Sequence, residues 1–341
     1  MPATPTDFTL PIGRVHAIVD LAARRGWDTT ALLAEAGIAP QLLAQGRARV
    51  TAGQAVHLVQ QLWRATDDEI LGLGRAPMPR GTFRLVCFAL LGSRDVGAAL
   101  HRFRLFQKAL PGFPPLAVTA GADEARISFD LNGIRHPNEL IIDTMLMVSY
   151  RFLDWAVGGS LRLLRVEVPY PPNELDDYEL IFGAPVRFSA PHPALVVDPA
   201  VLATPLVRDE DDLIRFLRNA PEAVIGRRDD AVSTAARVRL ILEHGGPRDW
   251  PTVEQIAAEL SVSPATLRRK LRDEHTSTSH IREQILRDNA IAALVRGDET
   301  VTALSRRLGF SEPSAFSRAF RRWTGSSPGS YQASTDLPAR A

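Results

Sequence analysis

The sequence lacks the features on which secreted, membrane-spanning and metal-binding proteins depend. Cys87 is the one cysteine in 341 residues, which excludes an internal disulfide, and no Cys/His cluster has the spacing of metal ligands. The first residues contain no basic leader followed by an apolar segment, and no apolar run reaches the roughly 18 residues that a transmembrane helix needs. We therefore expect a cytoplasmic protein without a structural metal ion.

Signatures of common enzymes are scarce as well. The sequence contains no Walker A loop, HExxH pair or GxGxxG fingerprint. The histidines of its first two hundred residues lack metal-ligand spacing: His16, His57, His101, His136 and His192. We therefore expect neither a catalytic site nor a bound cofactor, and we expect these histidines at surface or core positions.

Positive charge is concentrated near the C-terminus. The whole chain has a net charge of +1. Residues 235–333 contain 15 Arg and Lys against 11 Asp and Glu, whereas residues 1–234 contain 24 against 27. The C-terminal cations are grouped at 268–272 and 318–322, and grouped cations raise the local potential, which favours a nucleic-acid partner. A solvated helix surface is the alternative.

The spacing of apolar residues predicts an α+β fold for the N-terminal part. Apolar residues recur every three or four positions in four segments typical of amphipathic helices: 15–22, 56–63, 82–91 and 95–110. Alternating residues then predict a hairpin that turns at 121–124, followed by a helix from about Pro137 to Trp155. Three further short strands are expected at 165–168, 186–188 and 194–197. Together these elements predict helices and a small, mainly antiparallel sheet.

A charged stretch separates this part from the C-terminal one. Charged residues at 208–212 and 226–230 flank a short helix at about 213–218, as is typical of an interdomain linker. We therefore predict four segments: a regulatory domain (1–204), a linker (205–234), a DNA-binding domain (235–333) and a tail (334–341).

The C-terminal part contains an internal repeat. Stretches that start at Thr252 and Thr300 share one pattern of apolar, small and basic positions, and each predicts a short helix, a turn and a second helix. The second helices start at Ser263-Pro264 and Ser311-Glu312-Pro313, where serine is expected to cap and proline to occupy the first turn. Residues 279–296 predict a connecting helix about 27 Å long, which is compatible with two reading helices about 34 Å apart.

The residues of this repeat carry a family resemblance. Residues 305–325 (SRRLGFSEPSAFSRAFRRWTG) closely resemble the second helix-turn-helix of the AraC/XylS regulators, and 327–331 resemble its closing Ser-Pro-x-x-Tyr motif. The similarity extends over about 235–333. Two positions depart from the family pattern: Gln332 stands where arginine is usual, and 275–277 replace a glycine-containing turn.

The resemblance implies that exposed positions of the two second helices contact DNA. The candidates for reading bases are Ala265, Arg268, Arg269, Ser314, Ser317 and Arg318, because a guanidinium can bond guanine in a bidentate way. The candidates for phosphate contacts are Thr266, Arg272, Arg321 and Arg322. For each arginine, a phosphate or surface role remains the alternative to base reading. By spacing, the core positions are Leu267, Leu271, Phe316, Phe320 and Trp323.

The N-terminal part also resembles a known domain. Residues 13–221 are similar to the arabinose-binding-type domain of the subgroup that includes ornithine-utilisation and virulence regulators. The resemblance is carried by residues 136–140, 151–155, 166–170 and 182–188. It implies an effector-binding role without identifying arabinose as the effector. Six aromatic residues are candidates for an effector pocket, with ordinary core packing as the alternative: Tyr150, Phe152, Trp155, Tyr170, Phe182 and Phe188.

These observations predict a bacterial transcription regulator that senses a small molecule and binds promoter DNA. RNA polymerase is an expected partner if the protein is an activator, and a homodimer is compatible with the resemblance. The alternative is a metabolite-binding protein or enzyme whose helical C-terminal region contacts other proteins. Binding to DNA with a steep salt dependence would distinguish the two, because phosphate neutralisation releases counterions.

Overall fold

The computed structural model describes residues 9–71, 73–132, 134, 139–172, 182–218, 233–274 and 276–332. The chain forms two compact units. Residues 1–58 and 226–341 form the first, and residues 59–225 form the second. None of the helices in the described ranges is long and apolar enough to cross a membrane. The predicted tail, 334–341, lies outside the described residues, as do His136, Pro137 and His275.

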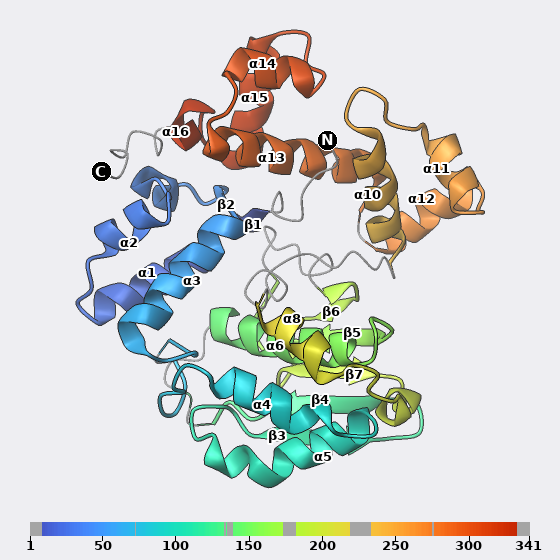
Figure 1. Ribbon diagram of the computed structural model, residues 1–341. Helices are drawn as coiled ribbons and strands as arrows, with labels where there is room; N and C mark the ends of the chain where they lie inside the picture. The colour runs from blue at the N-terminus through green and yellow to red at the C-terminus, as the bar shows by residue number, and fades with distance from the viewer. Residues whose placement is uncertain are drawn as a thin grey trace. The chain divides into compact units, whose positions relative to one another are not determined.

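The C-terminal part of the first compact unit is entirely helical. Its helices are α10 (Thr234–Gly245), α11 (Val253–Glu259), α12 (Pro264–Asp273), α13 (Thr278–Arg296), α14 (Val301–Arg307), α15 (Pro313–Thr324) and α16 (Gly329–Gln332). Figure 1 shows the pairs α11–α12 and α14–α15 joined by the long helix α13. The prediction of two helix-turn-helix elements linked by a long helix is confirmed.

The N-terminal part of the first compact unit contains two short strands and several helices. These are β1 (Thr9–Pro11), α1 (Ile12–Arg24), α2 (Thr29–Glu35), η2 (Pro40–Ala44), β2 (Arg49–Thr51) and α3 (Ala52–Thr66), the last of which continues into the second compact unit. β1 and β2 pair antiparallel, with Leu10 opposite Val50. All six strand residues are buried, and both strands pack against α13.

Hydrogen bonds tie this N-terminal segment to the C-terminal helices. Thr9 Oγ1 donates to Asp288 Oδ1 on α13 at 2.6 Å, and Arg49 Nε donates to Thr9 Oγ1 at 2.8 Å. The backbone N–H of Arg49 donates to the hydroxyl of Tyr331 on α16 at 3.1 Å. The compact units therefore divide the chain differently from the predicted segments, since residues 9–51 pack with α13 and α16.

The second compact unit contains a five-stranded sheet. Its strands are β3 (Leu116–Ala120), β4 (Ala125–Phe129), β5 (Leu163–Glu167), β6 (Val186–Arg187) and β7 (Ala194–Val197). Their order is β3-β4-β7-β5-β6, and of these pairs only β5 and β6 run parallel. The predicted hairpin turn at 121–124 and the mainly antiparallel sheet are confirmed. β7 is buried at all four positions, as expected of a central strand.

Helices surround this sheet. They are α4 (Thr82–Leu91), α5 (Val96–Phe106), η3 (Gln107–Ala109), α6 (Glu139–Ala156), η4 (Pro199–Ala203) and α8 (Glu210–Arg218). α5 packs against β3, α6 against β7 and α8 against α4. Gly158 and Gly159, which follow α6, have φ of 81° and 85°, left-handed values that glycine adopts without steric cost. The predicted end of this helix near Trp155 is therefore confirmed.

The first part of the predicted linker is packed against α6. Leu213 and Phe216 of α8 are buried, and the ring of Phe216 stacks on Trp155 with centroids 4.7 Å apart. The N–H of Val207 donates to the carbonyl of Ala156 at 2.9 Å. Residues 205–218 are thus part of the second compact unit, while 219–232 lie outside the described residues.

Candidate nucleic-acid interface

The first helix-turn-helix is built from local capping interactions. Thr252 accepts from the N–H of Gln255, whose side chain accepts from the N–H of Thr252, so a reciprocal capping box starts α11. After α11, Ser261 adopts a left-handed φ of 56°, and the N–H of Val262 closes the turn on the carbonyl of Ala257 at 2.9 Å. Ser263 then caps α12, with proline in its first turn. These contacts fix the direction of α12.

The second helix-turn-helix repeats this geometry. Thr300 caps α14, Gly309 adopts a left-handed φ of 84°, and the N–H of Phe310 closes the turn on the carbonyl of Ser305 at 3.0 Å. The N-cap of α15 is Glu312, whose side chain makes no capping bond. The predicted serine cap at Ser311 is wrong, because α15 begins one residue too late for Ser311 to reach its first turn.

Apolar side chains anchor both second helices. Leu267 and Leu271 of α12 are buried in a cluster with Val238, Leu242 and Ile256. Phe316 and Phe320 of α15 are fully buried, as the spacing predicts. Trp323 is half-buried, and its indole Nε1 donates to Glu283 of α13 at 2.6 Å. These helices are therefore positioned by their inner faces, which leaves their outer faces available.

The predicted base-reading residues lie on these outer faces. Ala265, Arg268 and Arg269 of α12 are exposed, as are Ser314 and Arg318 of α15, and Ser317 is half-exposed. The structure therefore groups three candidates on each second helix.

The hydroxyls and cations on this surface differ in their partners. Ser314 donates to Glu312 at 3.0 Å, and Ser317 donates to the carbonyl of Pro313 at 2.9 Å. The guanidinium of Arg268 lies 3.7 Å from Glu254, with both side chains 65% exposed. Within the described residues, Arg269 and Arg318 make no ion pair. Among the described base-reading candidates, these two guanidinium groups are therefore the exposed cations without an ion-pair partner.

The predicted phosphate-contacting residues are of two kinds. Arg272 and Arg321 are exposed, and the Thr266 hydroxyl lies 2.9 Å from that of Ser263. Arg322, by contrast, pairs with Glu283 of α13. Burial raises the pKa of Glu283, but hydrogen bonds from Arg322 and Trp323 outweigh it and hold that pKa below its ordinary value. Arg322 thus connects α15 to α13.

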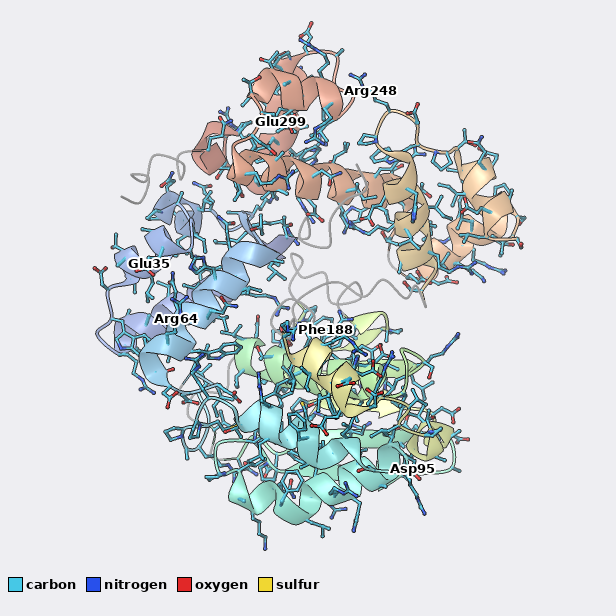
Figure 2. The ribbon with its side chains drawn as sticks, in the orientation of Figure 1. Glu35, Arg64, Asp95, Phe188, Arg248 and Glu299 are labelled. Carbon is cyan, nitrogen blue, oxygen red and sulfur yellow. The ribbon has the colours of Figure 1, made fainter. Side chains whose placement is uncertain are left out.

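The two helix-turn-helix elements also contact each other. Arg248, in the loop between α10 and α11, donates through Nη2 to the carbonyl of Arg306 on α14 at 2.6 Å (Figure 2). Arg282 of α13 donates to the carbonyl of Pro251 at 2.7 Å and lies over the ring of Trp250. The two elements are therefore braced directly as well as through α13.

A buried ionic network that the sequence pattern did not predict lies between α10 and α13. Arg239 of α10 is 2% exposed, and its guanidinium lies 3.6 Å from Asp288 and 3.5 Å from Glu243. It also donates to Gln284 at 2.7 Å. Arg239 is one of the 15 cations of residues 235–333, and no local pattern predicts its partners. Its place on the apolar face of α10, beside Val238 and Leu242, was the available signal that it is buried.

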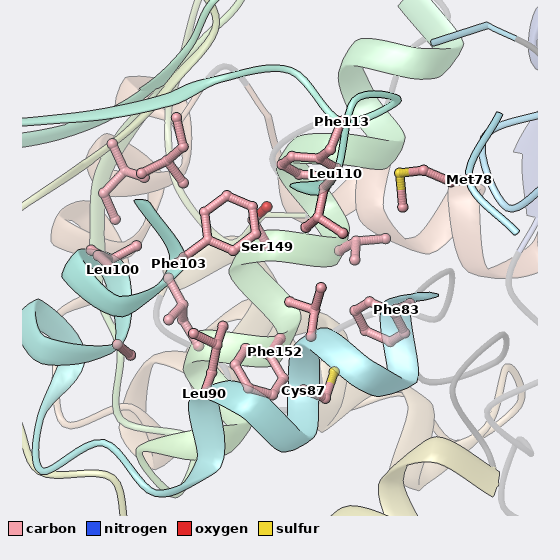
Figure 3. Close-up of a pocket in the computed structure, with 16 residues that line it drawn as sticks. Met78, Phe83, Cys87, Leu90, Leu100, Phe103, Leu110, Phe113, Ser149 and Phe152 are labelled. Atoms are coloured by element: carbon pink, nitrogen blue, oxygen red, sulfur yellow. The ribbon is translucent and has the colours of Figure 1, made fainter. Parts of the chain in front are cut away.

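The six predicted effector-pocket aromatics are distributed over several ring contacts. Only Phe152 lines the cavity shown in Figure 3. The ring of Tyr150 packs near Phe182, Trp155 stacks on Phe216, and Tyr170 packs near Phe188. The hydroxyl of Tyr170 also donates to Asp143. A role in one shared pocket stays a prediction for these five residues.

One short segment has the spacing of a hydrolase motif. Residues 325–329 match the GxSxG pattern of a nucleophile turn, which requires a strand followed by a helix. Here the segment joins α15 to α16, and the Ser327 hydroxyl lies 3.0 Å from that of Ser330. The structural context of the hydrolase motif is therefore missing at this position.

A duplicated helix-turn-helix with cations on its outer faces defines the class of DNA-binding transcription regulators. The sequence profile described as the arabinose-binding domain of AraC transcription regulators, N-terminal, matches residues 26–206, and a helix-turn-helix domain profile matches residues 256–334. The chain belongs to the AraC family of transcriptional regulators, with an N-terminal ligand-binding domain and a C-terminal helix-turn-helix DNA-binding domain.

Several transcription regulators match this chain along most of their own length. The Ornithine utilization regulator of Pseudomonas aeruginosa is 25% identical, over 96% of this chain and 98% of its own. The HTH-type transcriptional regulator VqsM of the same organism is 26% identical, over 72% of this chain and 78% of its own. The uncharacterized HTH-type transcriptional regulator Rv1395 of Mycobacterium tuberculosis is 30% identical, over 96% of this chain and 97% of its own.

Proposed function

We propose that this protein binds promoter DNA sequence-specifically by placing α12 and α15 in successive major grooves. The observation that carries the proposal is the repeated geometry of the two elements. In both, a left-handed residue ends the first helix, and the second helix buries its apolar face and exposes its cations. α13 has 19 residues, which corresponds to about 28 Å. With helix widths added, this length suits the roughly 34 Å repeat of B-DNA.

Base reading is assigned to the exposed candidates of α12 and α15. Arg269 and Arg318 are the strongest of these, because their guanidinium groups have no ion-pair partner within the described residues and can face guanine edges. Arg268, Ala265, Ser314 and Ser317 complete the two reading surfaces. Arg272, Arg321 and Thr266 are assigned to phosphate, which adds affinity and orientation without sequence choice. Arg322 is assigned a weaker phosphate role because Glu283 already neutralises it.

Regulation is assigned to the N-terminal part. A small molecule bound by the domain that the family profile covers would shift the protein between states of different DNA affinity, which requires that it bind those states with different affinity. RNA polymerase is the proposed partner if the bound protein activates transcription. A homodimer would place four reading helices on a longer operator.

The test combines gel retardation with hydroxyl-radical footprinting, using the full-length protein and fragments from upstream of its own and neighbouring genes. Salt and random-sequence competitor are varied. We expect a footprint across two successive major-groove faces and an apparent affinity that falls steeply with salt, because bound cations release counterions. Repeating the experiment with Arg269→Ala and Arg318→Ala should reduce the preference for the specific fragment in each variant.

The alternative function predicts a different result. If the helical C-terminal part instead contacts proteins, no fragment is preferred at any salt concentration, and the two arginine variants behave like the wild-type protein. Such a result, obtained also with cell extract added to supply effectors, would overturn the proposal.

A further inference from the structure

An apolar cavity lies inside the second compact unit, between α4, α5, α6 and the strands β3 and β4. Its volume is about 80 Å³, and 16 residues line it. Fourteen of these residues are apolar, and the other two are Cys87 and Ser149. Figure 3 shows lining side chains from α4, α5 and α6 pointing into one space, including Cys87, Phe103 and Phe152.

The lining restricts the charge of any molecule that enters. No Asp, Glu, Lys, Arg or His is among the 16 lining residues. A charged ligand would lose its hydration without gaining an opposite charge, which costs several kcal/mol. An uncharged apolar molecule has no such cost, and it gains free energy by leaving water. The lining therefore selects against ions and against zwitterions.

The lining also restricts shape and size. Four phenylalanine rings contribute to it, and two of them, Phe103 and Phe113, meet edge to face with centroids 5.4 Å apart. Apolar cavities of about 150 Å³ take up benzene and stay dry when empty. At about 80 Å³, this cavity takes a compact molecule once a flexible side chain moves, and Met78 has the unbranched chain that adjusts most easily.

The wall that carries Met78 and Phe83 is held by carboxylates. Asp68 Oδ1 accepts from the N–H of Met78 at 2.9 Å and from that of Ile70 at 3.0 Å. Glu69 accepts from the N–H groups of Gly81 and Phe83, both at 2.7 Å. Side-chain bonds thus fix the backbone at Ile70, Met78, Gly81 and Phe83. Phe83 and Ser149 are both half-exposed, so the cavity approaches the protein surface beside them.

We propose that this cavity is the effector site and that it binds a small uncharged apolar molecule, either a short aliphatic chain or a single aromatic ring. The effector role rests on the proposed regulatory function, whereas binding itself does not. Occupancy would bring α4, α5 and α6 into contact with one ligand. It would therefore stabilise the packing of the helices that surround the sheet.

Cys87 makes the proposal testable. It is the only cysteine in the chain, it is fully buried, and it lines the cavity. Burial raises the pKa of its thiol well above the ordinary value, so it stays protonated and reacts only when the cavity opens. Cys87→Met should fill the cavity with a flexible side chain, and Cys87→Ala should enlarge it.

The experiment uses the full-length protein, without DNA, and a pair of probes. Toluene is the apolar probe, and benzoate replaces its methyl group by a carboxylate. We expect saturating toluene to raise the Tm by a few degrees, because a ligand that binds only the folded state stabilises it, and we expect benzoate to leave it unchanged. Cys87→Ala should keep the toluene response, and Cys87→Met should lose it.

A second measurement covers the case in which Cys87→Met does not fold. In the wild-type protein, toluene should slow the reaction of Cys87 with a thiol reagent at least several-fold, and benzoate should not. Equal effects of the two probes, no effect of toluene on the wild type or Cys87→Ala, or an undiminished response in Cys87→Met would overturn the proposal. Since no DNA is present, failure here leaves the DNA-binding proposal standing, and failed retardation leaves the cavity result standing.

Discussion

Two arginines on one helix illustrate how neighbouring cations acquire different roles. Arg318 and Arg322 are four residues apart on α15, and both are exposed. Arg322 is paired with Glu283 of α13, whereas Arg318 has no ion-pair partner within the described residues. A guanidinium that is already neutralised contributes less to the field around DNA than one that is not. The residues with the strongest expected effect on binding are therefore the ones that the fold leaves unpaired.

Replacing Arg318 by alanine should weaken specific DNA binding by about 1–3 kcal/mol if the residue reads a base. Binding to random DNA should change much less. The measurement is a titration of both DNAs at one salt concentration. Arg322→Ala is the matched control and should have the smaller effect. An equal loss on specific and random DNA would make Arg318 a phosphate contact instead.

The turns of the two helix-turn-helix elements show how one geometry is reached with two residue types. Ser261 and Gly309 occupy equivalent positions, with φ of 56° and 84°. A side chain in the left-handed region costs roughly 1–2 kcal/mol, which glycine avoids. The first element therefore carries a backbone strain that the second does not.

Exchanging residue types at these positions should have unequal effects. Gly309→Ala should lower the free energy of unfolding by about 1 kcal/mol, since a Cβ there makes only an ordinary contact, 4.0 Å from the carbonyl oxygen of Pro247, but has a disfavoured φ. Ser261→Gly should change it by less than about 0.5 kcal/mol, because relief of strain is offset by the greater entropy of the unfolded chain. Chemical denaturation of both variants checks this, and a larger loss for Ser261→Gly would contradict it.

The sheet contains a buried carboxylate that makes its stability depend on pH. Glu167 of β5 is 1% exposed and is bound by Arg126 of β4 and Arg165 of β5. Burial raises its pKa, but the hydrogen bonds from the two arginines outweigh burial and lower it below the ordinary 4.5. A carboxyl with a lowered folded-state pKa stabilises the protein above its unfolded pKa, and this stabilisation is lost as the pH falls through the folded value.

Glu167→Gln should therefore destabilise the protein at pH 7 and reduce the loss of stability below about pH 4.5. The expected cost at pH 7 is about 1–3 kcal/mol, since two charge-assisted hydrogen bonds are weakened while both guanidinium groups keep Glu124 as a partner. Denaturation curves at pH 7 and pH 4 provide the measurement. A variant whose stability falls with pH as steeply as that of the wild type would contradict this prediction.

At the scale of the whole molecule, the N-terminal segment and the C-terminal helices pack together in one compact unit. Residues 1–58 belong to the compact unit that holds both helix-turn-helix elements, and β1 and β2 pack on α13. Thr9 and Arg49 connect this segment to Asp288 of α13 and Tyr331 of α16. The helices of the DNA-binding domain are thus supported by residues that lie far from them in the sequence: Thr9 is 279 positions from Asp288, and Arg49 is 282 positions from Tyr331.

Removing the charged group of Arg49, which is 4% exposed, should loosen this support. In Arg49→Met, backbone amides of α13 and α16 should exchange with solvent at least several-fold faster, because the bonds from Arg49 to Thr9 are lost. Amides of α4 and α5 should be unaffected. Hydrogen exchange of the full-length chain measures this, with exposed Arg47→Met as the control. Acceleration spread equally over both compact units would contradict the prediction.

The sequence by itself determined the local architecture of this protein. Apolar spacing, the internal repeat and the proline positions predicted both helix-turn-helix elements and the connecting helix, because these signals act within a few residues of one another. The choice of Arg269 and Arg318 as exposed candidates followed from the family resemblance. The alternating segments predicted the hairpin and the strands of the sheet for the same reason.

Only the tertiary structure decided which distant segments meet. The association of residues 9–51 with α13, the burial of Arg239 beside Asp288, and the pairing of Arg322 with Glu283 each depend on contacts that no local pattern encodes. The same holds for the aromatic residues, whose partners the sequence did not predict: Phe152 lines the cavity, whereas Trp155 stacks on Phe216. A helix pattern shows which face is apolar, whereas the partner of that face is set by long-range packing.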